Sequence, residues 1–565
     1  MASVIGKKKG NQVYYYVVES ARVQGKPRIV SQAYLGTAEK LAALIKDRAA
    51  PVPVGATTSD YGLPGALWLA ARDSGVLGVL EQLWPAPRSG PSTAHYVLLA
   101  AIHRVCQPGP KTEVADWYKR TVLENLWRFP AERFTSQAFW DCFQRIGTGE
   151  DARPDDLEEA QLRLLACWKD RKLVSRRLLA YDTTNFHTYI ASTNERNQLA
   201  QRGHNKQGRH HLRQVGLSYV LDGENGLGLC HHVYPGNVPD ALELPVALER
   251  IGRMLDRNGI ERQTVTLVFD KGSAALENTL LLEQAQVGWI SALPWNQAPE
   301  ALRDRPVDQL SPCVSLPGVR VATETHLVHG QNYLCVLIYS SPFAAEQLHS
   351  LTTTLGKILP SLRRLAADLS RPGCKLKADQ VERRIKRWLS PPLVRDLVSW
   401  QLEDKGGRLQ LQFDFNNDAF HRIMTHRLGR TVLLTNRLDW SGEQVAAGYA
   451  GQQRLEQVFR GLKEGDWLGW GPMHHWTDSK IRIHAFCCML GISLLHYVHH
   501  QAQSAWPGIT MEQLKEELGQ IQQFHLLYPP QGEKGPYRAA RVLSKQTLTQ
   551  QALVKTLGLD QLSST

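Results

Sequence analysis

Two aspartates each end a short apolar run that is typical of a β-strand. Asp182 ends the run at 177–182, and Asp270 follows the run at 264–269. If these strands are neighbours in a sheet, both carboxylates come to one end of it, where they repel each other unless a cation lies between them. Mg²⁺ takes oxygen ligands of this kind, and a metal pair stabilises the attacking and leaving oxygens in phosphoryl displacement. For either Asp alone, the alternative is a turn former or helix cap after the strand.

A long helix predicted at 442–463 supplies a third acidic residue. Tyr449, Glu456 and Lys463 recur every seven residues, and at 3.6 residues per turn such steps return to within about 20° of one direction. Arg460 lies about 40° from Glu456. The flanking positions are apolar and can seat the helix on a sheet: Leu455, Val458 and Leu462. The alternative is a solvated face on which Glu456 and Arg460 form an ordinary i,i+4 pair.

The order of these residues resembles the Tyr-x2-Arg-x3-Glu-x6-Lys signature of a large group of bacterial insertion-sequence DDE transposases. Here the positions read Tyr449, Gln452, Glu456 and Lys463, and residues 455–463 are similar to the group's Ile-Glu-x-x-Phe-Arg-x-Leu-Lys block. Smaller motifs of the group are matched in order: Asp182-Thr183-Thr184, Gly203-His204-Asn205-Lys206, Gly236-Asn237-Val238-Pro239-Asp240, Asp270-Lys271-Gly272, His475-Trp476 and His484. The resemblance covers residues 176–500, and the segment 14–35 is similar to one large branch of the group.

The resemblance implies an α/β fold with an RNase H-like mixed sheet, interrupted by a β-rich insertion between the second Asp and the Glu. It implies that Asp182, Asp270 and Glu456 are catalytic and bind two Mg²⁺ ions, for which Mn²⁺ can substitute. One ion would activate water or a DNA 3′-OH, and the other would stabilise the leaving oxygen. It also implies DNA contacts by Tyr449, Arg460, Lys463 and Lys206.

Three positions depart from the signature of the group. Gln452 stands at the signature Arg, Gly471 stands where relatives usually carry Arg before Pro, and Gln207 stands where many carry Asp. Arg454 is no simple substitute, because it lies roughly 160° around the helix from Glu456. We therefore expect a weaker grip on phosphate, or one supplied by Arg460 together with His475 and His484.

The composition indicates a globular, multidomain chain. It has 565 residues, is 43% hydrophobic and carries a formal charge of +12, which favours a polyanionic partner. None of the nine Cys has Cys-x-x-Cys spacing, so we expect a reducing compartment, the bacterial cytoplasm near the nucleoid. The apolar segment at 481–498 is interrupted by Arg482, His484 and His496 and predicts a buried core helix. Adjacent His pairs are poor chelators, which argues against zinc.

The predicted organisation has six segments. Residues 1–55 form a small module of a hairpin, with strands at 13–22 and 27–35, and a helix. Residues 56–174 form a helical, candidate DNA-binding domain, in which 117–120 (WYKR) either contacts DNA or belongs to the core. The catalytic domain spans 175–305 and 437–505, around a β-rich insertion at 306–436. A helical tail follows at 506–565.

The function expected from these features is a cut-and-paste DNA transposase. It would bind the terminal inverted repeats of its element, cut them by Mg²⁺-dependent hydrolysis and join the 3′-OH ends to target DNA, as a homodimer in the synaptic complex. Two alternatives remain open from the sequence. One is a non-catalytic DNA-binding relic or repressor, and the other is a metal-dependent nuclease without strand transfer.

Overall fold

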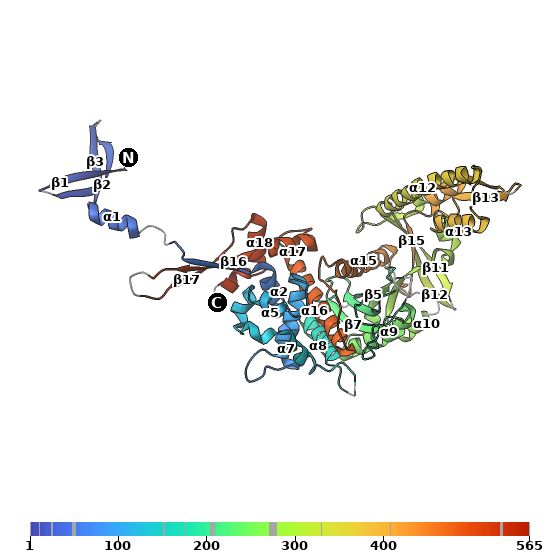
Figure 1. The fold of residues 1–565 in the computed structure, drawn as a ribbon, viewed down its shortest axis with the longest axis horizontal. Helices are drawn as coiled ribbons and strands as arrows, with labels where there is room; N and C mark the ends of the chain where they lie inside the picture. Colours follow the sequence, from blue (N-terminus) through green and yellow to red (C-terminus); the bar gives the residue numbers. More distant parts are fainter. Residues whose placement is uncertain are drawn as a thin grey trace. The chain divides into compact units, whose positions relative to one another are not determined.

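The computed structural model divides the chain into two compact units, each built from separate parts of the sequence (Figure 1). Unit 1 combines residues 1–60 with 521–546, and unit 2 combines 61–520 with 547–565. The residues that the structure describes are 2–10, 12–23, 26–47, 52–150, 153–175, 177–203, 208–209, 211–270, 279–328, 330–406, 408–530 and 535–563.

Unit 1 contains two antiparallel three-stranded sheets. The first consists of β1 (Ala2–Lys9), β2 (Gln12–Val23) and β3 (Lys26–Thr37), followed by α1 (Ala38–Asp47). The second has β16 (Gln522–Tyr528) between β4 (Gly55–Asp60) and β17 (Arg538–Leu543). The segment 506–565, predicted as a helical tail, therefore also contains the two strands β16 and β17. The pairing of β16 with β4, near the other end of the chain, leaves no local sequence signal.

Unit 2 begins with a bundle of short helices, as the sequence predicts for this region. Its members are α2 (Gly62–Asp73), α3 (Val76–Leu83), α4 (Thr93–Cys106), α5 (Val114–Tyr118), α6 (Val122–Trp127), η1 (Ala131–Phe134), α7 (Ser136–Phe143) and α8 (Asp156–Asp170). Trp117 and Tyr118 are buried in this bundle. These two aromatic side chains therefore belong to the core rather than to a DNA-contacting surface.

A nine-stranded mixed sheet follows, in the order β10-β11-β12-β15-β9-β8-β5-β6-β7. Its strands are β5 (Leu178–His187), β6 (Gln214–Asp222), β7 (Gly228–Pro235), β8 (Thr266–Phe269), β9 (Gly288–Leu293), β10 (Ser311–Pro312), β11 (Val319–Val328), β12 (Gln331–Ser340) and β15 (Arg430–Thr435). The pairs β5–β8 and β8–β9 are parallel, and the other neighbours are antiparallel. Unit 2 is thus a mixed α/β structure around one large mixed sheet.

Helices cover both faces of the sheet where β5 and β6 pair. α15 (Gly442–Glu464) packs against β5 and β8. α9 (Asp240–Arg257) is held to β6 because the Ser218 hydroxyl donates a hydrogen bond to Glu243 at 2.8 Å. Ser218 pairs with Thr183 across β5 and β6, and side chains alternate between faces along a strand. Asp182 therefore lies on the face opposite to α9.

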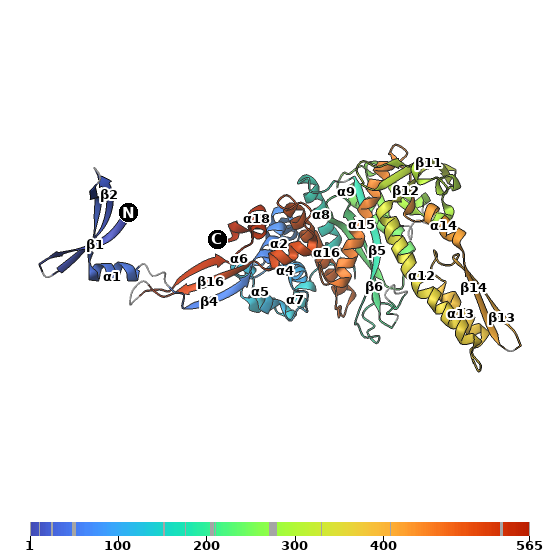
Figure 2. The same cartoon turned by 90° about the horizontal axis from the view of Figure 1, so that it is seen from above.

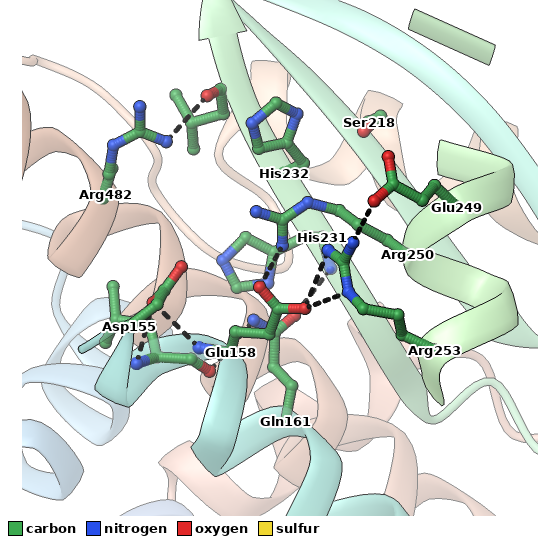
Figure 3. A network of polar contacts seen from close by, with 12 residues as sticks. Asp155, Glu158, Gln161, Ser218, His231, His232, Glu249, Arg250, Arg253 and Arg482 are labelled. Carbon is green, nitrogen blue, oxygen red and sulfur yellow. Dashed lines mark hydrogen bonds and ion pairs between the residues drawn. The ribbon is translucent and has the colours of Figure 1, made fainter. Parts of the chain in front are cut away.

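A network of charged side chains docks α8 onto α9 and β7 (Figure 3). Glu158 forms ion pairs with Arg250 at 3.4 Å and Arg253 at 3.0 Å. The Gln161 side chain accepts a hydrogen bond from the backbone N–H of His231 at 2.7 Å. These contacts satisfy polar groups between the helical bundle and the sheet, so they are structural in character.

The remaining helices of unit 2 complete the bundle and the sheet connections. α16 (Asp478–Ala502) packs against α2, α4 and β7, and the shorter elements are η2 (Arg262–Thr264), α10 (Thr279–Gln284), η5 (Trp295–Gln297), α11 (Glu300–Arg303), η6 (Val307–Gln309), α17 (Met511–Gly519), α18 (Leu548–Thr556) and η7 (Leu559–Ser563). Among the described helices, α16 alone is long and apolar enough to cross a membrane, but 89% of its apolar window is buried inside the protein. The prediction of a buried core helix at 481–498 is confirmed.

The region predicted as a β-rich insertion at 306–436 is organised differently. β10, β11, β12 and β15 belong to the main sheet. Between β12 and β15 lie α12 (Ser341–Ser370), α13 (Ala378–Trp388), the hairpin β13 (Val398–Asp404) and β14 (Leu409–Phe415), and α14 (Asn417–His426) (Figure 2). This part has its own core, which includes Leu362, Ile385 and Leu397. The inserted part is therefore smaller than predicted and mainly helical, because alternating strands extend a sheet as readily as they form a new one.

Candidate active site

Asp182 and Asp270 lie at the same level on two neighbouring parallel strands. In the register of β5 and β8, Tyr181 is opposite Phe269, and Asp182 and Asp270 are the next residues along. Neighbouring strands are about 4.8 Å apart, so the sheet itself holds the two carboxylates side by side. Asp270 follows the last residue of β8, as predicted. Asp182 does not end its strand, because β5 continues to His187, where it still pairs with β6.

Glu456 is carried by α15, whose limits are set by clear local signals. Ser441 caps the helix: its hydroxyl accepts from the Gln444 backbone N–H at 3.2 Å, and the Gln444 side chain accepts from the Ser441 N–H at 2.8 Å. Gly465, in a left-handed conformation with φ of 85°, ends it. The side chains that seat the helix are buried as predicted: Leu455, Val458 and Leu462.

Two side-chain contacts fix how α15 runs along β5. The Gln452 side chain donates to the backbone oxygen of Tyr181 at 3.4 Å, and the Lys463 ammonium lies 6.0 Å from the centre of the Phe186 ring. The eleven steps along the helix from residue 452 to 463 rise about 16.5 Å, and the five steps along the strand from residue 181 to 186 span about the same length. Helix and strand therefore run in the same direction, with Glu456 over the stretch that carries Asp182.

The electrostatics of the site reflect this crowding of carboxylates. Partial burial and the Asp270 carboxylate raise the pKa of Glu456, while Arg460 opposes the change. Burial raises the pKa of Tyr449, and the charges of Asp270, Glu456 and Asp182 raise it further. Tyr449 is thus close enough to all three carboxylates for their charges to affect its pKa. A solvated helix face would be expected to carry an i,i+4 ion pair of Glu456 and Arg460. No such ion pair is formed among the described residues.

The donor chemistry of the three acids fits a hard divalent cation, since all three offer carboxylate oxygens. In the described part of the chain, however, no three His, Cys, Asp or Glu side chains are close enough together to hold a metal ion. The structure thus brings Asp182 and Asp270 together and sets Glu456 above them, without closing a three-ligand shell.

The predicted DNA-binding residues fall into two groups. Arg460 and Lys463 are exposed on α15, on the side that carries Glu456, and Tyr449 is half-buried. Lys206 lies outside the described residues, as do the rest of its motif from 204 to 207 and Lys271-Gly272.

Gln452, the main departure from the signature, faces the sheet. Its side chain is 2% exposed, and its amide oxygen has no hydrogen-bond partner among the described residues. The Arg454 guanidinium donates to the backbone oxygens of Gly223 at 2.9 Å and of Glu224, so it braces the β6–β7 turn. At both positions the structure favours a role in seating α15 on the sheet.

An aromatic group beside Lys463 was missed by reasoning from the sequence. Phe186 stacks on Trp470 with ring centres 4.0 Å apart, and Trp470 contacts His484 at 5.3 Å. His475 lies 4.7 Å from His484, and burial lowers the pKa of both rings. Phe186 lies four residues after Asp182, on the same face of β5. That period-2 spacing was the available signal.

No protein-family model matches the chain, and no curated protein matches it either. Among solved structures, the piggyBac transposase synaptic complex with hairpin DNA is similar at 8% identity, over 81% of this chain and 76% of that chain, with a TM-score of 0.36. The Mos1 transposase paired-end complex with its left transposon end is similar at 14% identity, over 36% of this chain and 60% of that chain, with a TM-score of 0.15. Both neighbours are transposases. At scores this low, the functional assignment rests on the residues of the site.

Proposed function

We propose that this chain is a DDE-type DNA transposase that cuts the ends of a bacterial insertion sequence and transfers the 3′-OH ends to target DNA. The observation that carries the proposal is that Asp182 and Asp270 directly follow the paired residues Tyr181 and Phe269 of β5 and β8, beneath the helix that bears Glu456. An arrangement that concentrates negative charge on one exposed edge suits chemistry in which a cation is recruited. The mixed sheet with helices on both faces agrees with an RNase H-like core.

In this proposal Asp182, Asp270 and Glu456 hold the divalent ions, Mg²⁺ or Mn²⁺. When bound, the ions supply Lewis-acid stabilisation of the oxygens at the phosphorus. The fold fixes the arrangement of the three carboxylates. The strand register sets the spacing of the two aspartates, and α15 holds Glu456 above the sheet. The charge of Asp270, which raises the pKa of Glu456, is offset when a cation binds.

The cationic side chains of α15 position the DNA in this proposal. Arg460 and Lys463 lie on the same side of the helix as Glu456, so a backbone phosphate bound by them stays beside the carboxylates. Tyr449 offers a hydroxyl that remains protonated at neutral pH and can donate to a phosphate oxygen. Pairing of two ends would require a homodimer, acting at the bacterial nucleoid.

The decisive experiment compares Asp182→Asn and Glu456→Gln with wild type on a duplex that bears the inverted repeat flanking the gene. Nicking in Mg²⁺ should be lost in both variants, and duplex binding should persist. Glu464→Gln is the matched control, because Glu464 is an exposed acid on the same helix and should leave nicking unchanged. Full cutting by the double variant would refute the assignment.

The same assay separates the two alternatives from the proposal. Supplied with pre-cut ends and a target plasmid, a transposase yields joined product, whereas a nuclease of the same fold yields only nicks. Binding of the inverted repeat by wild type with no metal-dependent nicking would identify a non-catalytic DNA-binding protein.

A further inference from the structure

A second cluster of like charges lies in unit 2, outside the carboxylate site. A cavity of about 190 Å³ opens between the end of α4, the segment before α5, α7 and the start of α16. We call it the basic pocket. Its cationic and imidazole side chains are Arg104, Lys111, His474, His475 and Lys480. No Asp or Glu lines it among the described residues.

Two of these cations are almost completely buried. The Lys480 residue is 3% exposed and Arg104 is 5% exposed. The Lys480 ammonium donates to the Gln144 side chain at 3.2 Å, and Arg104 donates to the backbone oxygen of Gly469 at 3.1 Å. Within the described ranges, neither they nor Lys111 form an ion pair with a carboxylate. A buried charge without a counter-charge is unfavourable, so an anion that enters the cavity finds cations already in place.

The titration behaviour of the pocket is consistent with this geometry. Burial lowers the pKa of Lys111 to about 8, and the positive charge of Arg104 contributes. Burial also lowers the pKa of Lys480 to about 8; the Lys111 charge adds to this effect, while Cys142 and Asp141 oppose it. The pKa of His475 is held well below its usual range by burial and by the same cations. The two lysines remain largely protonated at neutral pH.

One wall of the pocket is aromatic. Trp140 and Phe143 lie on one face of α7, with the Lys480 ammonium 4.9 Å from the Trp140 ring centre and the Lys111 ammonium 5.4 Å from that of Phe143. Cation–π contacts hold both ammonium groups in place without neutralising them. Their charge therefore remains available to a ligand.

The pocket is connected to the carboxylate site through the aromatic side chains beyond Asp182. His474, which lines the pocket, stacks on Tyr189 with ring centres 5.4 Å apart. The Tyr189 backbone N–H donates to the Met473 oxygen at 2.9 Å. Tyr189 follows β5 directly, and Phe186 near the end of β5 lies under Lys463. Lys463 and the basic pocket therefore both lie near this end of β5.

We propose that the basic pocket binds a phosphate group, and that this phosphate belongs to a DNA strand whose neighbouring part reaches Arg460 and Lys463. The source of the phosphate rests on the proposed function, whereas the phosphate site itself does not. Clustered Arg and Lys donors suit phosphate oxygens. The volume is below the roughly 300–1,000 Å³ of sites that enclose a whole small molecule, so a phosphate attached to a chain fits better than a free nucleotide.

The test uses the full chain and two probes. The first probe is inorganic phosphate, titrated by calorimetry against chloride at equal ionic strength. The second is a fluorescein-labelled 30-base-pair duplex of arbitrary sequence, measured by anisotropy over a KCl series. The variants are Lys480→Gln and Lys111→Gln. Lys111 is only half-buried, so we expect the Lys111→Gln variant to fold normally. Lys357→Gln is the control, since Lys357 is an exposed lysine on α12.

We expect phosphate binding by wild type and by Lys357→Gln, and its loss in both pocket variants. Duplex affinity should fall about tenfold, the ratio for one charged hydrogen bond, and the slope of log K against log salt should become shallower by about 1. Unchanged phosphate and duplex binding in both pocket variants would overturn the proposal. If the two pocket variants lose phosphate binding but keep the wild-type affinity for the duplex, DNA is not the source of the phosphate. Phosphate binding by a chain that never nicks DNA would reject the transposase assignment and keep the phosphate site.

Discussion

The carboxylate site and the basic pocket are two clusters of like charge with opposite sign in the same unit. The first is built by sheet register, because Asp182 and Asp270 follow residues that pair in β5 and β8. The second is built by helix packing, because Arg104, Lys111 and Lys480 come from α4, the segment before α5, and α16. In both, burial shifts a pKa toward the neutral form, and a neighbouring like charge adds to the shift: the pKa of Glu456 is raised, and those of Lys111 and Lys480 are lowered.

The difference between them lies in exposure and in what each can recruit. The acids lie at a half-exposed edge of the sheet, where a hydrated cation can enter. The cations line a partly open cavity with an aromatic wall, where a phosphate group loses part of its water as it enters. A pKa shifted by burial and by a neighbouring like charge marks a candidate functional site. The following predictions test whether the two clusters behave as opposites.

The largest effect is expected from Asp270→Asn. Removing this carboxylate weakens cation binding, and metal stabilisation is worth several kcal/mol, so nicking should fall by at least about a hundredfold while duplex binding is kept. Mg²⁺ should also raise the melting temperature of wild type more than that of the variant. Asp439→Asn, at an exposed position before α15, is the control. If Asp270→Asn nicks DNA as fast as wild type, the carboxylate site does not recruit the catalytic cation.

The next effect concerns Gln452, beneath the carboxylate site. Gln452→Arg restores the signature residue but places a charge at a 2% exposed position that faces the sheet, which should lower the free energy of unfolding by about 2–4 kcal/mol. Urea denaturation measures this. Gln453→Arg, at the exposed neighbouring position, should change stability little. A stable Gln452→Arg variant with tighter DNA binding would show that this position faces DNA after all.

A smaller effect of opposite sign is expected in the basic pocket. Lys480→Met keeps the side-chain stem against Trp140 and removes a poorly solvated charge, so stability without DNA at pH 7 should rise by about 1–2 kcal/mol. The folded-state pKa of Lys480 is lowered from 10.5 to about 8. Between these values the unfolded chain binds more protons, so wild-type stability rises with pH and the advantage of the variant shrinks.

Thermal unfolding at pH 7, 8, 9 and 10 measures this convergence. Lys357→Met, on the exposed face of α12, should leave stability unchanged at every pH. Destabilisation by Lys480→Met at pH 7 would mean that the lysine acts as an ordinary packing residue.

The parts of the site that were predictable share a local signal. The line of Tyr449, Glu456 and Lys463 follows from helical periodicity, and both aspartates follow from apolar runs that are short enough to be strands. Their placement on neighbouring parallel strands was only a hypothesis, because pairing depends on residues far apart in the chain. The extension of β5 past Asp182 was missed, because the apolar run that predicts the strand ends at Asp182.

Elements that depend on distant contacts were not predictable. The sequence analysis did not predict the helices α9 and α12 or the strands β9 and β15. The strand β16 pairs with β4, which lies near the other end of the chain. The basic pocket was hidden for the same reason, because Arg104, Lys111 and Lys480 are ordinary residues until α4, α7 and α16 pack. Gln452 was read as a lost phosphate contact, whereas only the structure shows that it faces the sheet.

The smallest effect is expected from Lys463→Gln, and it connects the two clusters. Lys463 is exposed on α15, and its ammonium lies 6.0 Å from the centre of the Phe186 ring. A single phosphate contact contributes about 0.9 to the slope of log K against log salt, so duplex affinity should fall a few-fold with a shallower slope.

If Lys463 and the basic pocket bind one strand, the double variant Lys463→Gln/Lys111→Gln should lose the sum of the two slopes. Additivity in the slopes with full nicking at saturating DNA would show that Lys463 and the basic pocket, both near the end of β5, hold the strand, while the acids alone carry the chemistry. A double variant no weaker than Lys463→Gln would separate the pocket from the path of the DNA.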